Sequence, residues 1–557
     1  MFTAYATVSL LAVFLSINPY EGVNDWSKTA LMAVFLWQSR GIMAATGAVR
    51  TRRILAKTMI VFGLVAACGG LVELHGLGDE ARNLEGLYGI KGTFAHKNLF
   101  SDILFLSLPF SLFAVLRMRR AWRFAGVCSL ASGLVVIFLL QTRSVWLALA
   151  VSSLAGGILA LICPDWAPDM QAGLRGKWKQ LLLAATCSVL VLGIMTSFHG
   201  SIPVGMHARL TSSFDPSQNQ WRLMLWEKSL RMSRDHPWIG VGPGNWKIEF
   251  PRYGTDDIRV VGGEREGTET EFVRPHNDFI WVLCETGLAG GILYLSFFLG
   301  LLATCARSRI LSPDGEAGTY FACIFMGIMG YMVDAAFSFP RERIAHSAFL
   351  VLMAASILAF PGTGRKVERD RYPESRMFLI RNSYWAVLSL AILAVAWGWI
   401  RLDSEKSMRQ ALNARAESRW EDVVASIAKV DVKVYPLDAF GNPVMFYSGT
   451  ASFLLGDRKR AKAAFEDAMR SHPFHAHNLN NLGTLMEQAG DHAKAIDLYE
   501  RALYLRPGFE EVLLNCVSVH YNRGDYDRAR IWFSKCPPRH NNPRWKKIST
   551  LLDSLGK

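Results

Sequence analysis

Long apolar runs separated by short polar segments fill the first 400 residues of the chain. A helix needs about 20 apolar residues to cross a bilayer, and eleven runs approach that length. The second run is the weakest candidate, because Arg40 interrupts it. The pattern predicts an all-α membrane domain whose spans lie at roughly 2–18, 29–48, 55–75, 99–116, 123–140, 145–163, 181–198, 278–304, 319–338, 345–361 and 383–400.

Lys and Arg are concentrated in alternate loops between these runs. Cytoplasmic loops of membrane proteins are enriched in both residues. We therefore predict that the N-terminus is cytoplasmic and that, after eleven spans, the chain from residue 401 lies outside, in the periplasm of a Gram-negative cell. The long segments 76–98 and 199–276 then face the same side. The basic loops are 51–53, 117–123, 175–179, 306–309 and 364–381.

The pattern changes after residue 400 to that of a soluble helical repeat. Gly456, Gly490 and Gly524 are 34 residues apart, and each begins a similar stretch: GDRKRAKAAF, GDHAKAIDLY and GDYDRARIWF. This unit resembles the tetratricopeptide repeat over about 443–544, and 419–430 is similar to half of an earlier unit. The recurring small and aromatic positions are Ala461, Ala495, Ala529, Phe465, Tyr499 and Phe533.

Repeats of this kind bury a core only by stacking, and their concave faces bind peptides or proteins. We interpret residues 401–557 as a docking module for a protein partner; a rigid spacer or stabilising cap is the alternative. The membrane domain would then be residues 1–400, with the large outer loop at 199–276.

Composition supports this division and excludes some classes. Hydrophobic residues make up 51% and charged residues 19%, whereas a soluble protein has about 25% charged residues. The net charge of +14 follows from the basic loops, and no basic tail or basic-aromatic motif indicates nucleic-acid binding. The nine cysteines have no metal-binding spacing, so we expect no metal or cofactor. For Cys516 and Cys536, a disulfide and two free thiols both remain open.

Several ionisable residues lie where predicted spans meet the outer face. Such groups are costly in lipid and commonly serve function. Asn98 and Asp102 share a helix face, although Asn98 also fits a helix cap. Arg143 lies in a tight outer turn. It could serve a substrate, or its side chain could simply extend to the lipid headgroups. Arg222 lies on an amphipathic stretch expected to lie along the membrane surface.

The stretch RPHNDFIWVLCETGLAGG, residues 274–291, is the most informative of these boundaries. Asn277 and Asp278 fit caps of the following helix. Glu285 is about 13 Å along that helix from His276 and on its opposite side. We therefore expect Glu285 to hydrogen-bond a neighbouring span, with close approach permitted by Gly287, Gly290 and Gly291.

Arginines and one histidine thus converge on the outer face. Imidazole titrates near neutral pH, so His276 is the candidate base. Guanidinium groups suit a diphosphate and stabilise a phosphate leaving group. Arg341 and Arg343 could instead be ordinary charged residues at the end of a helix, with no contact to a substrate. The predicted substrate-binding arginines are Arg143, Arg222, Arg274, Arg341 and Arg343, with Asn98 and Asn277 in possible support.

These segments resemble the bacterial O-antigen ligase and O-antigen polymerase superfamily over roughly residues 80–360. The similar stretches are GTFAHKN, TRSVWLAL, HPWIGVGPGNW and PHNDFIWVLCETGLAGG. The chain departs from the family in having about eleven spans rather than twelve, and in its repeat tail.

The resemblance implies a metal-independent, inverting glycosyltransferase of the C-type membrane fold in the bacterial inner membrane. It would move a glycan from undecaprenyl diphosphate to lipid A core in the periplasm, or to another glycan or a protein acceptor. His276 matches the family's essential histidine, and Arg222 and Arg143 match its arginines. Whether His276 is a base or only positions the acceptor stays open.

Two other classes are compatible with part of the pattern. A transporter or flippase for a lipid-linked solute predicts inverted repeats and charges spread through the bilayer, whereas the polar residues here gather at one face. A non-catalytic anchor for the repeats needs only one span.

Overall fold

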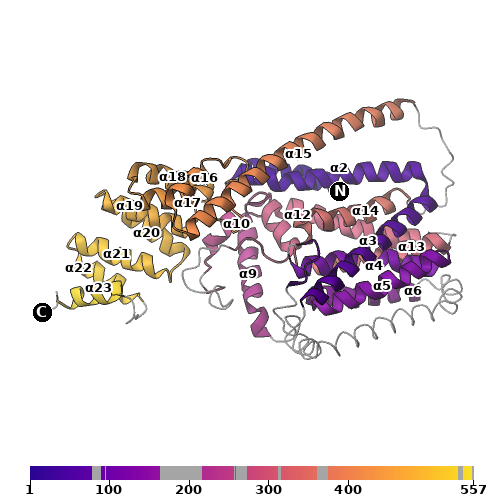
Figure 1. Cartoon of the computed structure of the whole chain (residues 1–557), viewed down its shortest axis with the longest axis horizontal. Helices are drawn as coiled ribbons and strands as arrows, with labels where there is room; N and C mark the ends of the chain where they lie inside the picture. Colours follow the sequence, from indigo (N-terminus) through magenta and orange to yellow (C-terminus); the bar gives the residue numbers. More distant parts are fainter. Residues whose placement is uncertain are drawn as a thin grey trace.

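The structure is a computed structural model that describes residues 1–77, 89–94, 96–162, 216–255, 257–258, 272–311, 315–360, 374–536 and 543–554. All of its named elements in these ranges are helices, which confirms the all-α prediction (Figure 1). The helices of the bundle are α1 (Phe2–Phe14), α2 (Pro19–Thr46), α3 (Ala48–Gly76), α4 (Lys97–Arg117), α5 (Arg120–Leu140), α6 (Arg143–Ile162), α12 (Asp278–Leu311), α13 (Gly315–Ala335), α14 (Ile344–Leu358) and α15 (Glu374–Ala416).

Ten of the eleven predicted spans coincide with these helices, and the span at 181–198 lies outside the described residues. By length and composition, α3, α4, α5, α12, α13 and α15 each suffice to cross a membrane, while α1, α6 and α14 are shorter apolar helices. Helix α2 has the length but carries Glu21, Asp25, Lys28 and Arg40, and it does not belong to either group. The chain is a multi-pass membrane protein.

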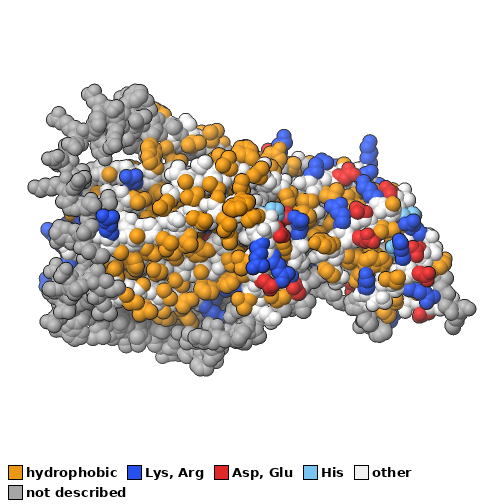
Figure 2. All heavy atoms as spheres, turned by 180° about the vertical axis from the view of Figure 1, so that it is seen from behind, with side chains coloured by type: hydrophobic (Ala, Val, Ile, Leu, Met, Phe, Trp, Pro, Cys, Tyr) orange, Lys and Arg blue, Asp and Glu red, His pale blue; other side chains and the backbone are white. Residues whose placement is uncertain are grey.

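Helix α4 forms the centre of the bundle, between α3, α5 and α13. Its Phe100, Phe110 and Phe113 are fully buried. On the face seen in Figure 2, hydrophobic side chains cover most of the described part of the bundle, whereas acidic and basic side chains gather over the C-terminal helices. An extended apolar surface of this kind is expected where a helical bundle contacts lipid.

Helix α12 is kinked at Gly287, where φ is 63° and ψ is −167°. The loop that contains HPWIGVGPGNW packs into this kink. The Val241 and Gly242 amides donate to the carbonyls of Cys284 and Glu285, both at 2.9 Å, and the Leu288 amide donates to Pro237 at 2.7 Å. The glycine-rich stretch is thus a structural clamp. Gly287 is approached by this loop rather than by a neighbouring span.

We expect Gly287→Ala to lower the free energy of unfolding by at least about 1–2 kcal/mol, since a left-handed backbone costs an L-residue that much. The added Cβ would also lie 2.3 Å from the Trp238 carbonyl carbon. A thermal melt of the detergent-solubilised protein measures the effect. Gly69→Ala on α3 is the control, because nothing lies within 4 Å of its added Cβ; equal melting temperatures for both variants would contradict the clamp.

The C-terminal helices form the repeat array. They are α16 (Trp420–Ile427), α17 (Val444–Leu454), α18 (Arg458–Ser471), α19 (Ala476–Gln488), α20 (His492–Leu505), α21 (Glu510–Asn522), α22 (Tyr526–Ser534) and α23 (Pro543–Ser554). Asp457, Asp491 and Asp525 each cap the second helix of a unit. The recurring alanines at 461, 495 and 529 are fully buried. The residues that recur every 34 positions are therefore those that cap a helix or pack in the core of the repeats.

Helix α15 runs without interruption through residue 400, the predicted domain boundary. Its C-terminal part buries Met408, Ala411 and Ala414 in the core of the repeats, together with α16. This part of α15 supplies the partner helix that the half-unit at 419–430 lacked in the sequence. Cys516 and Cys536 are free thiols, which settles the alternative left open above.

The repeat array contacts the bundle at the end from which α12 begins (Figure 1). There the short helices α10 (Trp246–Glu249) and η4 (Phe250–Tyr253) follow the clamp. Asn18 bridges the two parts: its amide donates to Asn245 at 2.8 Å, and its side chain donates to the Ser471 carbonyl at 3.1 Å. Arg252 also lies over the ring of Phe474.

Candidate functional site

His276 lies in the short segment that leads into α12, and aromatic rings hold it in place. Its imidazole packs edge-on against Trp221 of α9 (Pro216–Asp235), with ring centroids 5.4 Å apart, and against Phe339 at 5.2 Å. Trp226 donates from its indole nitrogen to the Pro275 carbonyl at 2.8 Å. The residue has a positive φ of 54°, so the chain bends sharply here to enter the membrane domain.

Helix α12 is capped as the sequence suggested. The Asn277 side chain accepts from the Ile280 amide at 3.0 Å. Asp278 is used differently: its carboxylate accepts from the Arg341 amide at 2.9 Å, which fixes the segment after α13 to the start of α12. Both contacts position His276 and the neighbouring arginines.

Three arginines gather on the aromatic rings beside His276. The Arg222 guanidinium lies over Trp221 at 5.2 Å. Arg274 and Arg343 lie over Phe339, at 4.8 and 5.8 Å from its centroid. Burial and the charge of Arg143 lower the pKa of Arg222, so Arg143 acts on the same group. The structure thus brings four of the five predicted arginines toward His276.

These surroundings keep the imidazole neutral. Burial, followed by the charges of Arg222 and Arg274, lowers the pKa of His276 to about 3. An uncharged imidazole among cations retains a lone pair that can accept a proton. The site therefore combines a proton acceptor with an excess of positive charge, which suits an anionic substrate.

Arg341 does not belong to this group, which corrects its assignment with the substrate-binding arginines. Its guanidinium turns into the bundle and bonds Tyr5 at 3.2 Å and Glu285 at 3.1 Å, and lies 3.8 Å from Asp25. Its charge is already balanced by buried acids. Glu285 therefore bonds the connection between α13 and α14, not a neighbouring span as expected.

Glu342 is an acidic residue of the site that was not predicted from the sequence. It lies in η5 (Pro340–Glu342), and its carboxylate pairs with Arg274 through two hydrogen bonds, one of them 2.8 Å long. Burial would raise the pKa of Glu342, but the hydrogen bond and charge of Arg274 outweigh it, so the pKa is lowered. The signal was present in PRERIAH, where one acid stands between two arginines.

The start of α4 completes the surroundings. His96, not Asn98, caps this helix by accepting from the Asn98 amide at 3.1 Å. The Asn98 side chain accepts from Thr142 at 3.3 Å, next to Arg143 in the turn between α5 and α6. Asn98 therefore ties α4 to the turn that carries Arg143. His346, one helical turn into α14, bonds the Leu99 carbonyl at 2.8 Å and is structural.

Comparisons with known proteins find one family in the membrane domain and another in the C-terminal repeats. The family described as O-antigen ligase matches residues 128–295, which include Arg143, Arg222, Arg274 and His276. Tetratricopeptide-repeat families match residues 451–508 and 486–552.

The individual similarities are partial. The chain is 32% identical over 119 residues to the photosystem I assembly protein Ycf3 of Acaryochloris marina, covering 21% of this chain and 69% of that protein. Two crystal structures of MamA are 20% identical to it, with TM-scores of 0.23 and 0.22; they cover 27% and 29% of this chain and 81% and 84% of MamA.

The ligase match includes His276 and three of the four arginines beside it but ends before Arg343, and the repeat matches lie in the stacked C-terminal helices. The chain therefore carries a segment of the O-antigen ligase family, at residues 128–295, within its membrane domain, and tetratricopeptide repeats at its C-terminal end.

Proposed function

We propose that this protein is an inverting, metal-independent glycosyltransferase of the bacterial inner membrane. It transfers a glycan from an undecaprenyl diphosphate carrier to an acceptor in the periplasm, with lipid A core as the first candidate. The observation that carries the proposal is the neutral His276 beside Arg222 and Arg274, at the end of the bundle where the chain enters the membrane.

The chemistry follows from these groups. Arg222, Arg274 and Arg343 hold the diphosphate and stabilise its growing negative charge as the anomeric C–O bond breaks. The acceptor hydroxyl attacks the anomeric carbon from the opposite side, and its proton passes to the imidazole of His276. Undecaprenyl diphosphate leaves with the bonding electron pair, and the glycan is joined to the acceptor with inverted configuration.

Donor binding itself makes His276 a better base. In the free protein, the charges of Arg222 and Arg274 help to depress the pKa of its imidazole. A bound diphosphate neutralises those charges, so the pKa of His276 rises from about 3, while the part of the lowering that comes from burial remains. The base gains strength only when the leaving group is in place.

This coupling predicts an unusual pH dependence. The free protein keeps His276 neutral, so kcat/KM shows no acidic limb near pH 6.5 and stays level down to about pH 5, because the pKa is about 3. The pH profile of kcat reports the donor complex. Its acidic limb therefore lies at higher pH than that of kcat/KM. Initial rates between pH 4.5 and 8.5 measure both. An acidic limb of kcat/KM near pH 6.5 contradicts the depressed pKa.

The proposed function is tested with purified protein in proteoliposomes that contain an undecaprenyl diphosphate-linked glycan. Three acceptors are offered in parallel: lipid A core, a second lipid-linked glycan, and a periplasmic protein mixture. Transfer to one of them that persists in EDTA supports the proposal and selects ligase, polymerase or protein glycosylation. Movement of the lipid-linked glycan across the bilayer without transfer indicates a flippase instead.

The repeats suit recruitment on this same side. They contact the bundle at the end that carries His276, and tetratricopeptide arrays commonly bind protein partners. We therefore place residues 401–557 in the periplasm, where they would bring a protein acceptor or an export partner to the site.

A further inference from the structure

Trp238 projects from the clamp loop beside α12 and is 72% exposed. The backbone on both sides of it is fixed. The Leu288 amide donates to the Pro237 carbonyl at 2.7 Å. The Val241 amide donates to the Cys284 carbonyl at 2.9 Å. The loop is thus held rigidly while its indole stays outside the core, where it is available for a contact with something outside the chain.

The clamp lies at the tip of α12, where this helix breaks. Phe279 and Phe298 lie on opposite sides of the break at Gly287. A straight helix would separate them by about 28 Å, at 1.5 Å per residue, yet their ring centroids are 6.0 Å apart. The first half of α12 therefore folds back against the second half, and Leu288 begins the second half beside the clamp.

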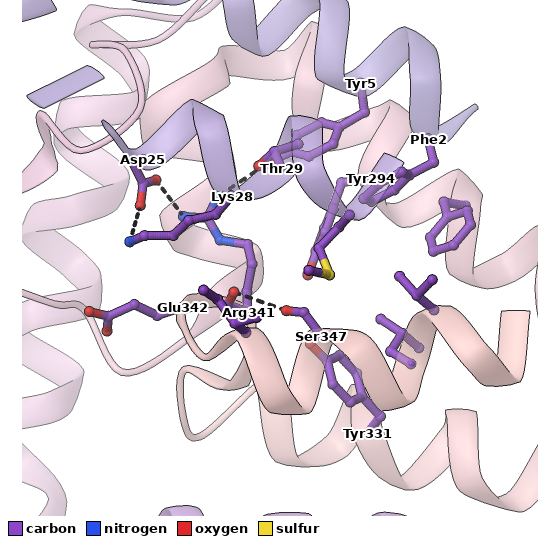
Figure 3. A pocket seen from close by; sticks show the side chains of 15 residues that line it. Phe2, Tyr5, Asp25, Lys28, Thr29, Tyr294, Tyr331, Arg341, Glu342 and Ser347 are labelled. Carbon is purple, nitrogen blue, oxygen red and sulfur yellow. Dashed lines mark hydrogen bonds and ion pairs between the residues drawn. The ribbon is translucent and has the colours of Figure 1, made fainter. Parts of the chain in front are cut away.

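The second half of α12 has two different faces. Its inner face carries Tyr294, which lines a pocket together with the charged Asp25, Lys28 and Arg341 (Figure 3). Its outer face carries a row of exposed apolar residues at helical spacing, which are Leu288, Ile292, Leu295 and Leu299. In a multi-pass membrane protein, an outward apolar row of this kind is the side that faces lipid.

The length of this half-helix matches the thickness of a bilayer. From Leu288 to the exposed Arg307, it rises by about 29 Å, and the hydrocarbon core is about 30 Å thick. Arg307 then lies at one edge of the hydrocarbon, where long basic side chains reach the headgroups. Trp238 lies at the other edge, where tryptophan is enriched because its ring is apolar and its N–H is polar.

We propose that Trp238 inserts into the headgroup layer of the bilayer and is the contact between the clamp and lipid. The Ala289 amide donates to the Trp238 carbonyl at 3.4 Å, so the indole continues the exposed row of α12 at its Leu288 end. A lipid surface fits this position better than a protein partner, because the α12 surface next to the indole itself faces lipid.

This contact fixes the depth of the candidate site relative to the headgroups. The Cys284 thiol donates to the Ser229 carbonyl at 3.1 Å, so the first half of α12 is bonded to α9 as well as to the clamp. The first half of α12 directly follows His276, and α9 carries Arg222. Because these segments are bonded to one another, an anchored indole holds both residues at a constant depth.

The test uses the full chain in vesicles of phosphatidylethanolamine and phosphatidylglycerol. Two photoreactive phospholipids are compared, one with a diazirine beside the glycerol and one with a diazirine at the end of an acyl chain. After irradiation, trypsin cleavage at Arg234 and Lys247 releases the peptide 235–247. This peptide is expected to carry label at Trp238 from the first lipid and none from the second. Tyr526, an exposed aromatic residue of α22 in the repeats, is the control and should carry neither label.

Two variants separate the indole from the rest of the loop. Trp238→Ala removes the ring but keeps the clamp hydrogen bonds, which join backbone atoms. Its melting temperature in detergent should therefore stay at the wild-type value, while the label on peptide 235–247 falls to the background measured at Tyr526. Trp238→Tyr keeps an amphipathic ring and should retain the label.

Three results would overturn the inference. Labelling of peptide 235–247 by the acyl-end probe places the loop in the hydrocarbon rather than among the headgroups. Unchanged labelling of Trp238→Ala shows that the contact does not depend on the indole. If neither lipid labels peptide 235–247, Trp238 faces water or a protein partner instead. All three are read from labelling alone, whether or not the protein transfers a glycan.

Discussion

Replacing His276 by alanine is expected to reduce glycan transfer by about 100- to 10,000-fold, the usual contribution of a positioned general base. The neutral imidazole packs between Trp221 and Phe339 and faces the arginines that would hold the donor. Transfer in proteoliposomes measures the loss, and inhibition by inorganic diphosphate should be unchanged. His236→Ala is the control, because His236 is a part-exposed histidine of the preceding loop.

A second substitution separates the two roles of His276. If the imidazole accepts a proton, His276→Gln is as inactive as the alanine variant at every pH. If it only positions the acceptor, the amide of Gln restores a substantial part of the rate. Wild-type transfer by His276→Ala, in protein that accumulates normally in membranes, rejects the site assignment altogether.

The second large effect is expected from Arg222→Ala. A charge-assisted contact with a part-buried phosphate is worth about 2–3 kcal/mol, so kcat/KM should fall by roughly 30- to 150-fold. The inhibition constant for inorganic diphosphate should rise in parallel. Because Arg222 helps to depress the pKa of His276, its removal should also move the acidic limb of kcat/KM to higher pH.

The matched control for Arg222 is on the same helix. Arg231 is exposed and pairs with Glu227 one turn away, so Arg231→Ala should leave donor binding and the pH profile unchanged. Arg222→Lys keeps the charge but loses the planar fork, and should recover only part of the affinity. An unshifted pH profile in Arg222→Ala, together with normal diphosphate inhibition, separates Arg222 from the site.

Much of the architecture was predictable from local pattern. Ten predicted spans coincide with helices, because a bilayer imposes long apolar runs that sequence shows directly. The repeats were predictable because Gly456, Gly490 and Gly524 recur at fixed spacing with a capping Asp after each. Cys516 and Cys536 were not decided in this way, since pairing depends on distances that spacing does not give.

The site was only partly predictable. Arg143, Arg222, Arg274 and Arg343 were predicted because charges near apolar spans stand out, and their role in substrate binding stays a prediction. Arg341 was wrongly grouped with them, because sequence shows a charge but not its partner, and here the partners are buried acids on α2 and α12.

Glu342 and the clamp could not be predicted from the sequence for the same reason. Glu342 is 68 residues from Arg274, and the clamp residues reach Gly287 across more than 40 residues of sequence. The sequence by itself determined the membrane helices, the repeat period and the identity of His276 as the candidate base, because these depend on local periodicity and residue chemistry. Only the tertiary structure decided that Arg341 is paired with buried acids while other arginines gather beside His276, because this depends on contacts between helices distant in sequence.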